Sequence, residues 1–331
     1  MSVLSWLGRG QPSIAPLIIG GAPPSSEPRC AALLPLGMMP LLPGEEKEVW
    51  FSDQASRALI AHAVAEHHSC CAQLLVRGGG ELVGITGLLE IHRLAVEDDS
   101  TRLLLRCVGR VGIREVHQTE GTEFLVAKVE PFADDVEHAS SEQADMEAAL
   151  GLSEGGGGKT SEAASAVAKA AEASGLSEAE LLAQMQALLS NLEGELRSTL
   201  ASLSALRAQL WQQGADEPGA AALIAELEAL GEDRGASLDE LVATRTDVLT
   251  AAALADGGAP CDCLSELWGV DVDAGKRQVL SFAAAATLGG AVRANALVST
   301  SASQRLYMAL AAAREQQRRL GAVLALKGLV G

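Results

Sequence analysis

Residues 33–44 read Leu-Leu-Pro-Leu-Gly-Met-Met-Pro-Leu-Leu-Pro-Gly, an almost wholly apolar stretch interrupted three times by proline. Proline lacks the amide proton and fixes φ, so neither a helix nor a central strand can run through all twelve residues. We therefore predict that this stretch is a short edge strand that enters a small sheet or barrel. The chain should then turn at Pro43-Gly44, where both residue types favour a tight turn.

The next ninety residues alternate between one helical pattern and several extended ones. Ser52 offers an N-cap for a helix over residues 54–67, whose apolar residues would lie on a sheet. Strands are predicted over 71–76, 82–96, 101–116 and 123–132, with internal glycines that indicate bulges or bends. A strand, a helix and then several antiparallel strands make an α+β domain with a bent, barrel-like sheet.

These elements carry motifs that are similar to the N-terminal domain of Lon proteases. The motifs, in chain order, are Leu34-Pro35-Leu36-Gly37, Leu42-Pro43-Gly44, Arg57-Ala58-Leu59-Ile60, Gly87–Ile91, Arg102–Val116 and Leu125–Pro131. The resemblance implies a PUA-like β-barrel with a flanking helix, whose known role in that family is to recognise substrate polypeptide. Two features depart from the family pattern: Leu42 replaces an aromatic residue, and the helix entry at 51–57 lacks a Tyr and one Arg.

Beyond residue 160 the sequence is helical. The most regular element is a helix over residues 178–211 with apolar residues at alternating steps of three and four, which is typical of a coiled-coil seam. The seam residues are Leu182, Met185, Leu189, Leu192, Leu196, Thr199, Leu203, Leu206 and Leu210. Flanking leucines widen this stripe, which favours packing on helices of the same chain; self-association through the seam is the alternative.

The sequence thus divides into four parts. Residues 1–30 are expected to be a disordered lead or the remnant of a targeting segment, and residues 31–132 to form the Lon-like β domain. Residues 133–160 have the acidic and glycine-rich composition of a linker, and residues 161–330 form the helical region.

The formal net charge of −18 argues against a nucleic-acid partner, because such binding relies on Lys and Arg displacing counterions. The charge is uneven: residues 1–132, 133–269 and 270–331 carry −4, −19 and +5. No apolar run approaches the ~20 residues of a membrane span. We expect a soluble intracellular protein, in the cytoplasm or in an organelle such as a plastid or mitochondrion.

No pattern that carries chemistry is found. The six cysteines lack the spacing of a zinc site, so neither a metal nor a cofactor is expected. The segment Ser153–Thr160 ends in Gly-Lys-Thr but has Ser153 where a phosphate-binding loop needs its first Gly, and no strand is expected before it. The sequence therefore predicts a protein that is not an enzyme.

The predicted function is non-catalytic recognition of unfolded or specific polypeptides, linked to protein quality control. Candidate contact residues are Met38, Met39, Trp50 and Phe51, because exposed apolar and adaptable side chains suit varied partners. Two alternatives remain open: a structural or adaptor protein that assembles through its long helix, and a degradation adaptor.

Overall fold

The computed structural model describes residues 29–37, 39–76, 80–97, 99–118, 122–132, 134, 178–213, 237–254 and 272–330. The chain forms two compact units. Unit 1 comprises residues 1–133, 242–279 and 293–298, and unit 2 comprises residues 134–241, 280–292 and 299–331. Three of the five boundaries between the units fall inside helices, and each unit is described separately below.

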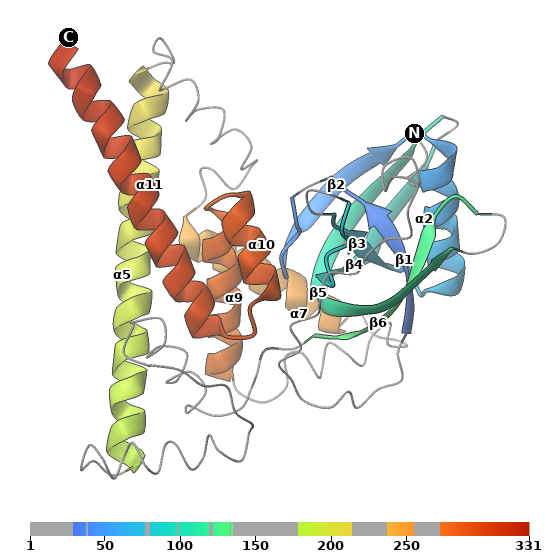
Figure 1. Cartoon of the computed structure of the whole chain (residues 1–331), viewed down its shortest axis with the longest axis horizontal. Helices are drawn as coiled ribbons and strands as arrows, with labels where there is room; N and C mark the ends of the chain where they lie inside the picture. The colour runs from blue at the N-terminus through green and yellow to red at the C-terminus, as the bar shows by residue number, and fades with distance from the viewer. Residues whose placement is uncertain are drawn as a thin grey trace. The chain divides into compact units, whose positions relative to one another are not determined.

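Six strands lie in the first part of the chain and are followed by most of the helices. The strands are β1 Arg29–Pro35, β2 Glu46–Phe51, β3 Cys70–Leu74, β4 Ile85–Val96, β5 Thr101–Gln118 and β6 Leu125–Pro131. The described helices are α2 Gln54–Glu66, α5 Glu178–Gln213, α7 Leu238–Leu254, α9 Val272–Ala286, α10 Gly290–Val298 and α11 Ala302–Val330. The protein is thus mixed α+β, with an N-terminal sheet and later helices, as predicted (Figure 1).

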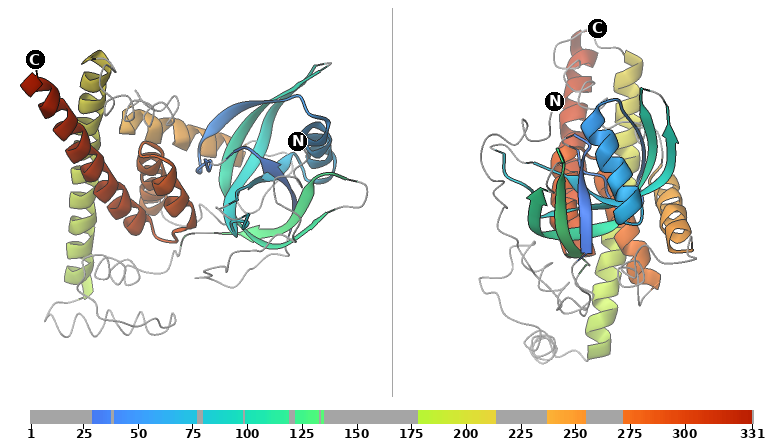
Figure 2. Two further views of the ribbon diagram at one scale, coloured as in Figure 1. Left: turned by 45° about the horizontal axis from the view of Figure 1, so that its top comes forward. Right: turned by 90° about the vertical axis from the view of Figure 1, so that its right-hand side faces the viewer.

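The six strands form one sheet in the order β2-β5-β4-β3-β1-β6, and β6 also pairs with β5. Pairings therefore run from β5 through β4, β3, β1 and β6 back to β5, and β2 extends the sheet beyond this ring. All pairs are antiparallel except β1 with β3. The strong curvature of the long strand β5 is visible in Figures 1 and 2. It coincides with register shifts of β4 at Leu88/Leu89 and of β5 at Ile113/Glu115.

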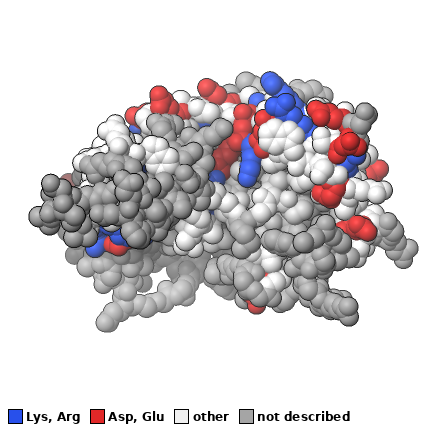
Figure 3. All heavy atoms as spheres, turned by 90° about the horizontal axis from the view of Figure 1, so that it is seen from above, with Lys and Arg blue, Asp and Glu red and all other residues white. Residues whose placement is uncertain are grey.

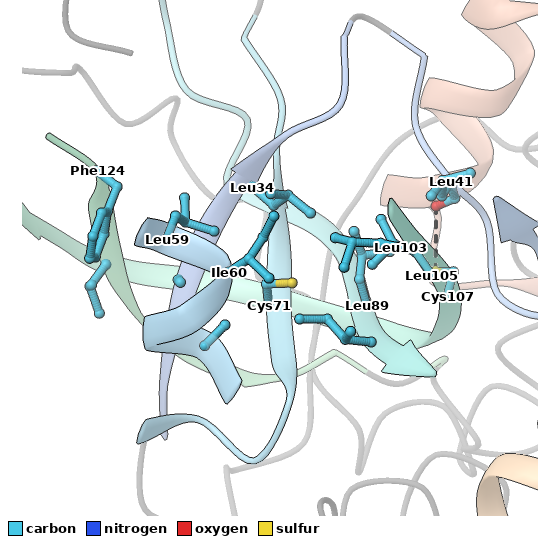
Figure 4. Packing of buried hydrophobic residues seen from close by; sticks show 14 residues of the cluster. Leu34, Leu41, Leu59, Ile60, Cys71, Leu89, Leu103, Leu105, Cys107 and Phe124 are labelled. Carbon is cyan, nitrogen blue, oxygen red and sulfur yellow. Dashed lines mark hydrogen bonds between the residues drawn. The ribbon is translucent and has the colours of Figure 1, made fainter. Parts of the chain in front are cut away.

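Alternate residues of β1 enter two different apolar clusters. Ala31 and Leu33 belong to the cluster on one face of the sheet, whereas Ala32 and Leu34 belong to the cluster on the other face. The second cluster is closed by helix α2 through Leu59, Ile60 and Ala63 (Figure 4). Because both faces are buried, β1 reads as a continuous apolar run, in contrast to the polar-apolar alternation of a half-exposed strand.

Two local predictions were wrong. β1 is an interior strand that pairs with β3 and β6, because Pro35 is its last residue and Pro40 and Pro43 lie beyond it. Helix α2 is capped by Asp53 instead of Ser52: the Asp53 side chain accepts the N–H of Ser56 at 2.8 Å. Asp and Ser are comparable N-caps, so the choice between adjacent residues depends on where the strand before them ends.

Unit 2 contains the long helix α5, which packs against α11 of the same chain (Figure 1). Polar bonds join the two helices as well: Arg314 pairs with Glu195, and Arg207 Nη2 donates to Gln316 Oε1 at 2.6 Å. The buried residues of α5 are Leu189, Leu196, Leu200, Leu203, Arg207 and Leu210, all on one stripe. Self-association through this stripe stays a prediction.

A buried ion pair stabilises the other helices of unit 2. Arg305 of α11 is fully buried, pairs with Asp134 and donates to Ser281 Oγ of α9 at 2.8 Å. Its guanidinium also lies 4.1 Å from the centre of the Phe282 ring, a cation–π contact. Within the described residues, no helix is both long and apolar enough to cross a membrane.

Candidate functional site

The proline-rich stretch ends in a turn that sets the start of β2. The N–H of Glu45 donates to the carbonyl of Leu42 at 3.0 Å, and Gly44 has a φ of +81°. Proline at the second and glycine at the third position define a type II turn, which requires positive φ at the glycine. A Cβ on Gly44 would lie 2.7 Å from Cβ of Arg245, so glycine is also required for space.

Gln73 of β3 replaces the backbone pairing that the prolines prevent. It is fully buried, its Oε1 accepts the N–H of Leu41 at 2.8 Å, and its Nε2 donates to the carbonyl of Met39 at 2.9 Å. One side-chain amide thereby satisfies a donor and an acceptor of a segment that has left the sheet. This geometry explains how an apolar, proline-rich segment stays buried at low energetic cost.

The carboxylate of Glu45 is buried directly after the turn and is held by two arginines. Oε1 accepts Arg245 Nη2 at 2.7 Å and Arg293 Nη2 at 2.5 Å, and Oε2 accepts the N–H of Leu42 at 2.7 Å. The arginines also donate to backbone carbonyls, Arg245 Nη1 to Pro43 at 2.9 Å and Arg293 Nε to Pro40 at 3.2 Å. We call Glu45, Arg245 and Arg293 the arginine clamp.

Burial alone would raise the pKa of Glu45, but the charges of Arg245 and Arg293 and the Leu42 N–H together hold that pKa below its usual value. The carboxylate is therefore ionised at neutral pH. The hydrogen bonds to the two proline carbonyls help to satisfy the buried guanidinium groups. The arginine clamp is a structural element: it fixes the turn and with it the first residue of β2.

β2 then pairs with β5, which in turn pairs with β4. At the end of these strands away from Glu45, Trp50 pairs with Arg102, which pairs with Ala95 on its other side. Phe51 likewise pairs with Thr101, which pairs with Val96. We define this end, residues 49–51, 94–96 and 101–103, as the sheet tip. Because side chains alternate along a strand, Trp50 lies on one face of the sheet tip, and Phe51, Leu94 and Val96 lie on the other.

The sheet tip carries most of the exposed large apolar side chains described in unit 1. Trp50 is 61% exposed, Val96 67% and Leu94 43%. The Arg102 guanidinium lies 5.4 Å from the centre of the Trp50 ring and pairs with Glu48, whose hydrogen bond with Arg102 holds the pKa of Glu48 below its usual value. On the face shown in Figure 3, acidic and basic side chains are intermixed and do not form separate patches.

The four residues predicted as contacts lie in different surroundings. Trp50 and Phe51 are both at the sheet tip, on opposite faces, and Phe51 is half-buried against the cluster beneath α2. Met39 is half-buried, and its carbonyl is bonded to Gln73. Met38 lies outside the described residues.

Sequence reasoning missed Leu94 and Val96. Both belong to β4, whose first seven residues are mostly buried and whose last five are exposed. The sequence around them, Ile91–Val96, has no feature that separates a buried apolar residue such as Ile91 from an exposed one such as Leu94. A signal was present in the sequence Asp-Asp-Ser at 98–100, which is typical of a turn, since connecting segments lie at the surface.

The described residues offer little for catalytic or metal chemistry. No group of three or more His, Cys, Asp or Glu side chains among them suits a metal ion. Cys71 and Cys107 are buried, and burial raises the pKa of the Cys107 thiol to about 12, which leaves it protonated and unreactive. The arrangement that can act on a partner is the exposed apolar surface of the sheet tip.

The class defined by this fold and surface is a mixed α+β binding domain. A family model for the ATP-dependent protease La (LON) substrate-binding domain matches residues 31–225, more than half of the chain. The chain belongs to this family, as its motifs predicted. Only the substrate-binding domain is found in the chain; no protease or ATPase domain is matched.

Two solved structures illustrate the similarity. One is the Lon N-terminal domain protein from Xanthomonas campestris, with 20% identity and a TM-score of 0.28, over 38% of this chain and 75% of that one. The other is the N-terminal domain of the Mycobacterium avium complex Lon protease, with 16% identity and a TM-score of 0.29, over 37% of this chain and 66% of that one. No curated protein matches the chain significantly.

Proposed function

We propose that this protein recognises polypeptides through the sheet tip and performs no chemistry on them. The family is named for substrate binding, and the sheet tip supplies exposed apolar surface of the kind that marks interaction sites. The observation that carries the proposal is the exposure of large apolar side chains on both faces of the sheet tip, Trp50 on one face and Leu94 and Val96 on the other. A role in protein quality control, in the cytoplasm or in an organelle, belongs to the same proposal.

The PUA-like barrel is also part of this interpretation. Its support is the ring of pairings among β5, β4, β3, β1 and β6, with one apolar cluster on each face of β1. We further propose that residues 31–132 are the recognition domain.

The proposal is tested with a chemically unfolded probe, reduced and carboxymethylated α-lactalbumin, by fluorescence anisotropy. We expect micromolar binding by the full chain and at least about fivefold weaker binding by Val96→Asp, since a charge replaces an apolar contact. Val64→Asp is the matched control, because Val64 is also exposed (38%) but lies on α2. Absence of binding by the wild-type chain, or equal weakening by both variants, would overturn the proposal.

A second candidate function is assembly through α5. Leu188 and Trp211 of α5 are exposed, although other leucines of the helix are buried within the chain. Light scattering of the full chain tests this: a dimer that Leu188→Asp dissociates and the neighbouring exposed Ala187→Asp does not would support an adaptor role. A monomer at all concentrations would eliminate it.

A further inference from the structure

β2 is the edge strand of the sheet. It is the first strand in the order β2-β5-β4-β3-β1-β6 and pairs with β5 only, among the strands that the structure describes. Its other edge is therefore available to a further strand, and such an edge is a template for an extended chain. Figure 2 shows β2 at the margin of the sheet.

The hydrogen-bond pattern determines which backbone groups of β2 face outward. The N–H of Cys107 donates to the Glu45 carbonyl and the N–H of Gly44 donates to the Cys107 carbonyl, both at 2.8 Å, so Gly44 and Glu45 together form a bulged hydrogen-bonded pair with Cys107. Such pairs alternate along an antiparallel ladder, so Lys47, Val49 and Phe51 direct their N–H and C=O toward β5. Glu46, Glu48 and Trp50 direct theirs toward the open edge.

The side chains of β2 divide into a charged half and an apolar half. Glu46 and Glu48 are each paired with an arginine of β5, Arg106 and Arg102, so their charges are compensated within the sheet. Lys47 is exposed and has no ion-pair partner among the described residues. Val49, Trp50 and Phe51 are uncharged, and Trp50 is the most exposed of the three.

We propose that an extended polypeptide segment adds to β2 as a new edge strand, bonded to the outward N–H and C=O groups of Glu46, Glu48 and Trp50. An apolar side chain of this segment would lie beside Trp50, and an acidic one beside Lys47, where it complements the one uncompensated charge of the strand. This inference rests on the proposed function and specifies how the polypeptide is bound: by its backbone, with few demands on its sequence.

The competing explanation is that the charges at 46–48 protect the edge from pairing, as charged residues do in many sheets. That explanation does not account for Val49–Phe51, where the same edge continues without a charge and with an exposed tryptophan. It also predicts that changing a backbone donor of β2 has no effect on polypeptide binding.

Glu48→Pro separates the two explanations. Proline removes the outward N–H of residue 48 but no bond to β5, whereas Glu48→Thr removes the same ion pair and keeps the N–H. With reduced, carboxymethylated α-lactalbumin as the probe, we expect Glu48→Pro to bind about tenfold more weakly than wild type and Glu48→Thr to bind within about threefold of it. Equal affinities of the two variants would overturn strand addition while leaving polypeptide recognition intact.

Hydrogen exchange of the wild-type full chain gives an independent readout that does not depend on folding of the proline variant. Addition of the same probe should slow exchange of the Glu46, Glu48 and Trp50 amides, with the already bonded amides of Lys47 and Val49 as internal controls. Binding that leaves the three outward amides unprotected would overturn the proposal. A wild-type chain that does not bind the probe would overturn both strand addition and the proposed function.

Discussion

Glu45 and Arg293 are 248 residues apart in the sequence and form a buried ion pair, with Arg293 Nη2 2.5 Å from Glu45 Oε1. Arg245 contacts the same oxygen. Each arginine also donates to a proline carbonyl, Arg245 to Pro43 in the turn and Arg293 to Pro40 before it. The turn that begins β2 is therefore held by two helical residues from the last third of the chain.

Loss of the Glu45 carboxylate should destabilise unit 1 strongly. Glu45→Ala leaves two buried guanidinium groups without their anion, and removing one partner of a buried ion pair costs about 3–5 kcal/mol. Urea unfolding followed by circular dichroism measures the loss. Glu46→Ala is the matched control: its ion pair with Arg106 is at the surface, so the change should be less than about 1 kcal/mol. Similar losses in both variants would contradict a stabilising arginine clamp.

The stability that Glu45 contributes should depend on pH in a defined direction. Its pKa is lowered in the folded protein, so the contribution is complete above the ordinary value of 4.5 and is lost as the pH falls through the folded pKa. The difference in unfolding free energy between wild type and Glu45→Gln should be constant from pH 5.5 to 7 and shrink below about pH 4.5. Urea titrations at a series of pH values measure this free-energy difference. A difference that grows on acidification would refute a lowered pKa of Glu45 in the folded protein.

Gly44→Ala should cost more than Gly37→Ala. Both glycines have positive φ, +81° and +92°, so alanine introduces backbone strain of about 1–2 kcal/mol at each position. Only Gly44 has Arg245 Cβ at 2.7 Å from the added methyl group, whereas nothing lies within 4 Å at Gly37. The two variants therefore separate strain from steric clash in urea unfolding, and equal losses would show that Arg245 does not pack against the turn.

Gln73→Leu should destabilise the protein although leucine is similar in size to glutamine. The substitution leaves the N–H of Leu41 and the carbonyl of Met39 without their partner, and a buried unsatisfied group costs about 1–3 kcal/mol. Thermal unfolding measures the loss. Gln54→Leu, at the exposed start of α2, is the control and should change the stability by less than about 0.5 kcal/mol. An unchanged melting temperature for Gln73→Leu would indicate that water replaces the amide.

Local sequence patterns predicted much of the fold. The Ser-x-x-Glu pattern at 237–240 is typical of a capping box, and the box is formed: Glu240 N–H donates to Ser237 Oγ at 3.2 Å, and Ser237 N–H donates to Glu240 Oε2 at 2.7 Å. The turn at Pro43-Gly44 was also predicted, since its geometry depends on two adjacent residues. Trp50 and Phe51 were selected as candidate contacts and lie at the sheet tip, whereas Leu94 and Val96 were not found.

The sequence by itself determined the elements whose causes are local: the turn at Pro43-Gly44, the α2 helix and the family motifs. Only the tertiary structure decided that β1 is interior, that β2 keeps one edge unpaired among the described strands and that Leu94 and Val96 are exposed. The physical reason is that burial and strand neighbours depend on which distant segments meet. The Leu33–Gly44 stretch shows both effects: its prolines set the turn, but Gln73, Arg245 and Arg293 hold it in place.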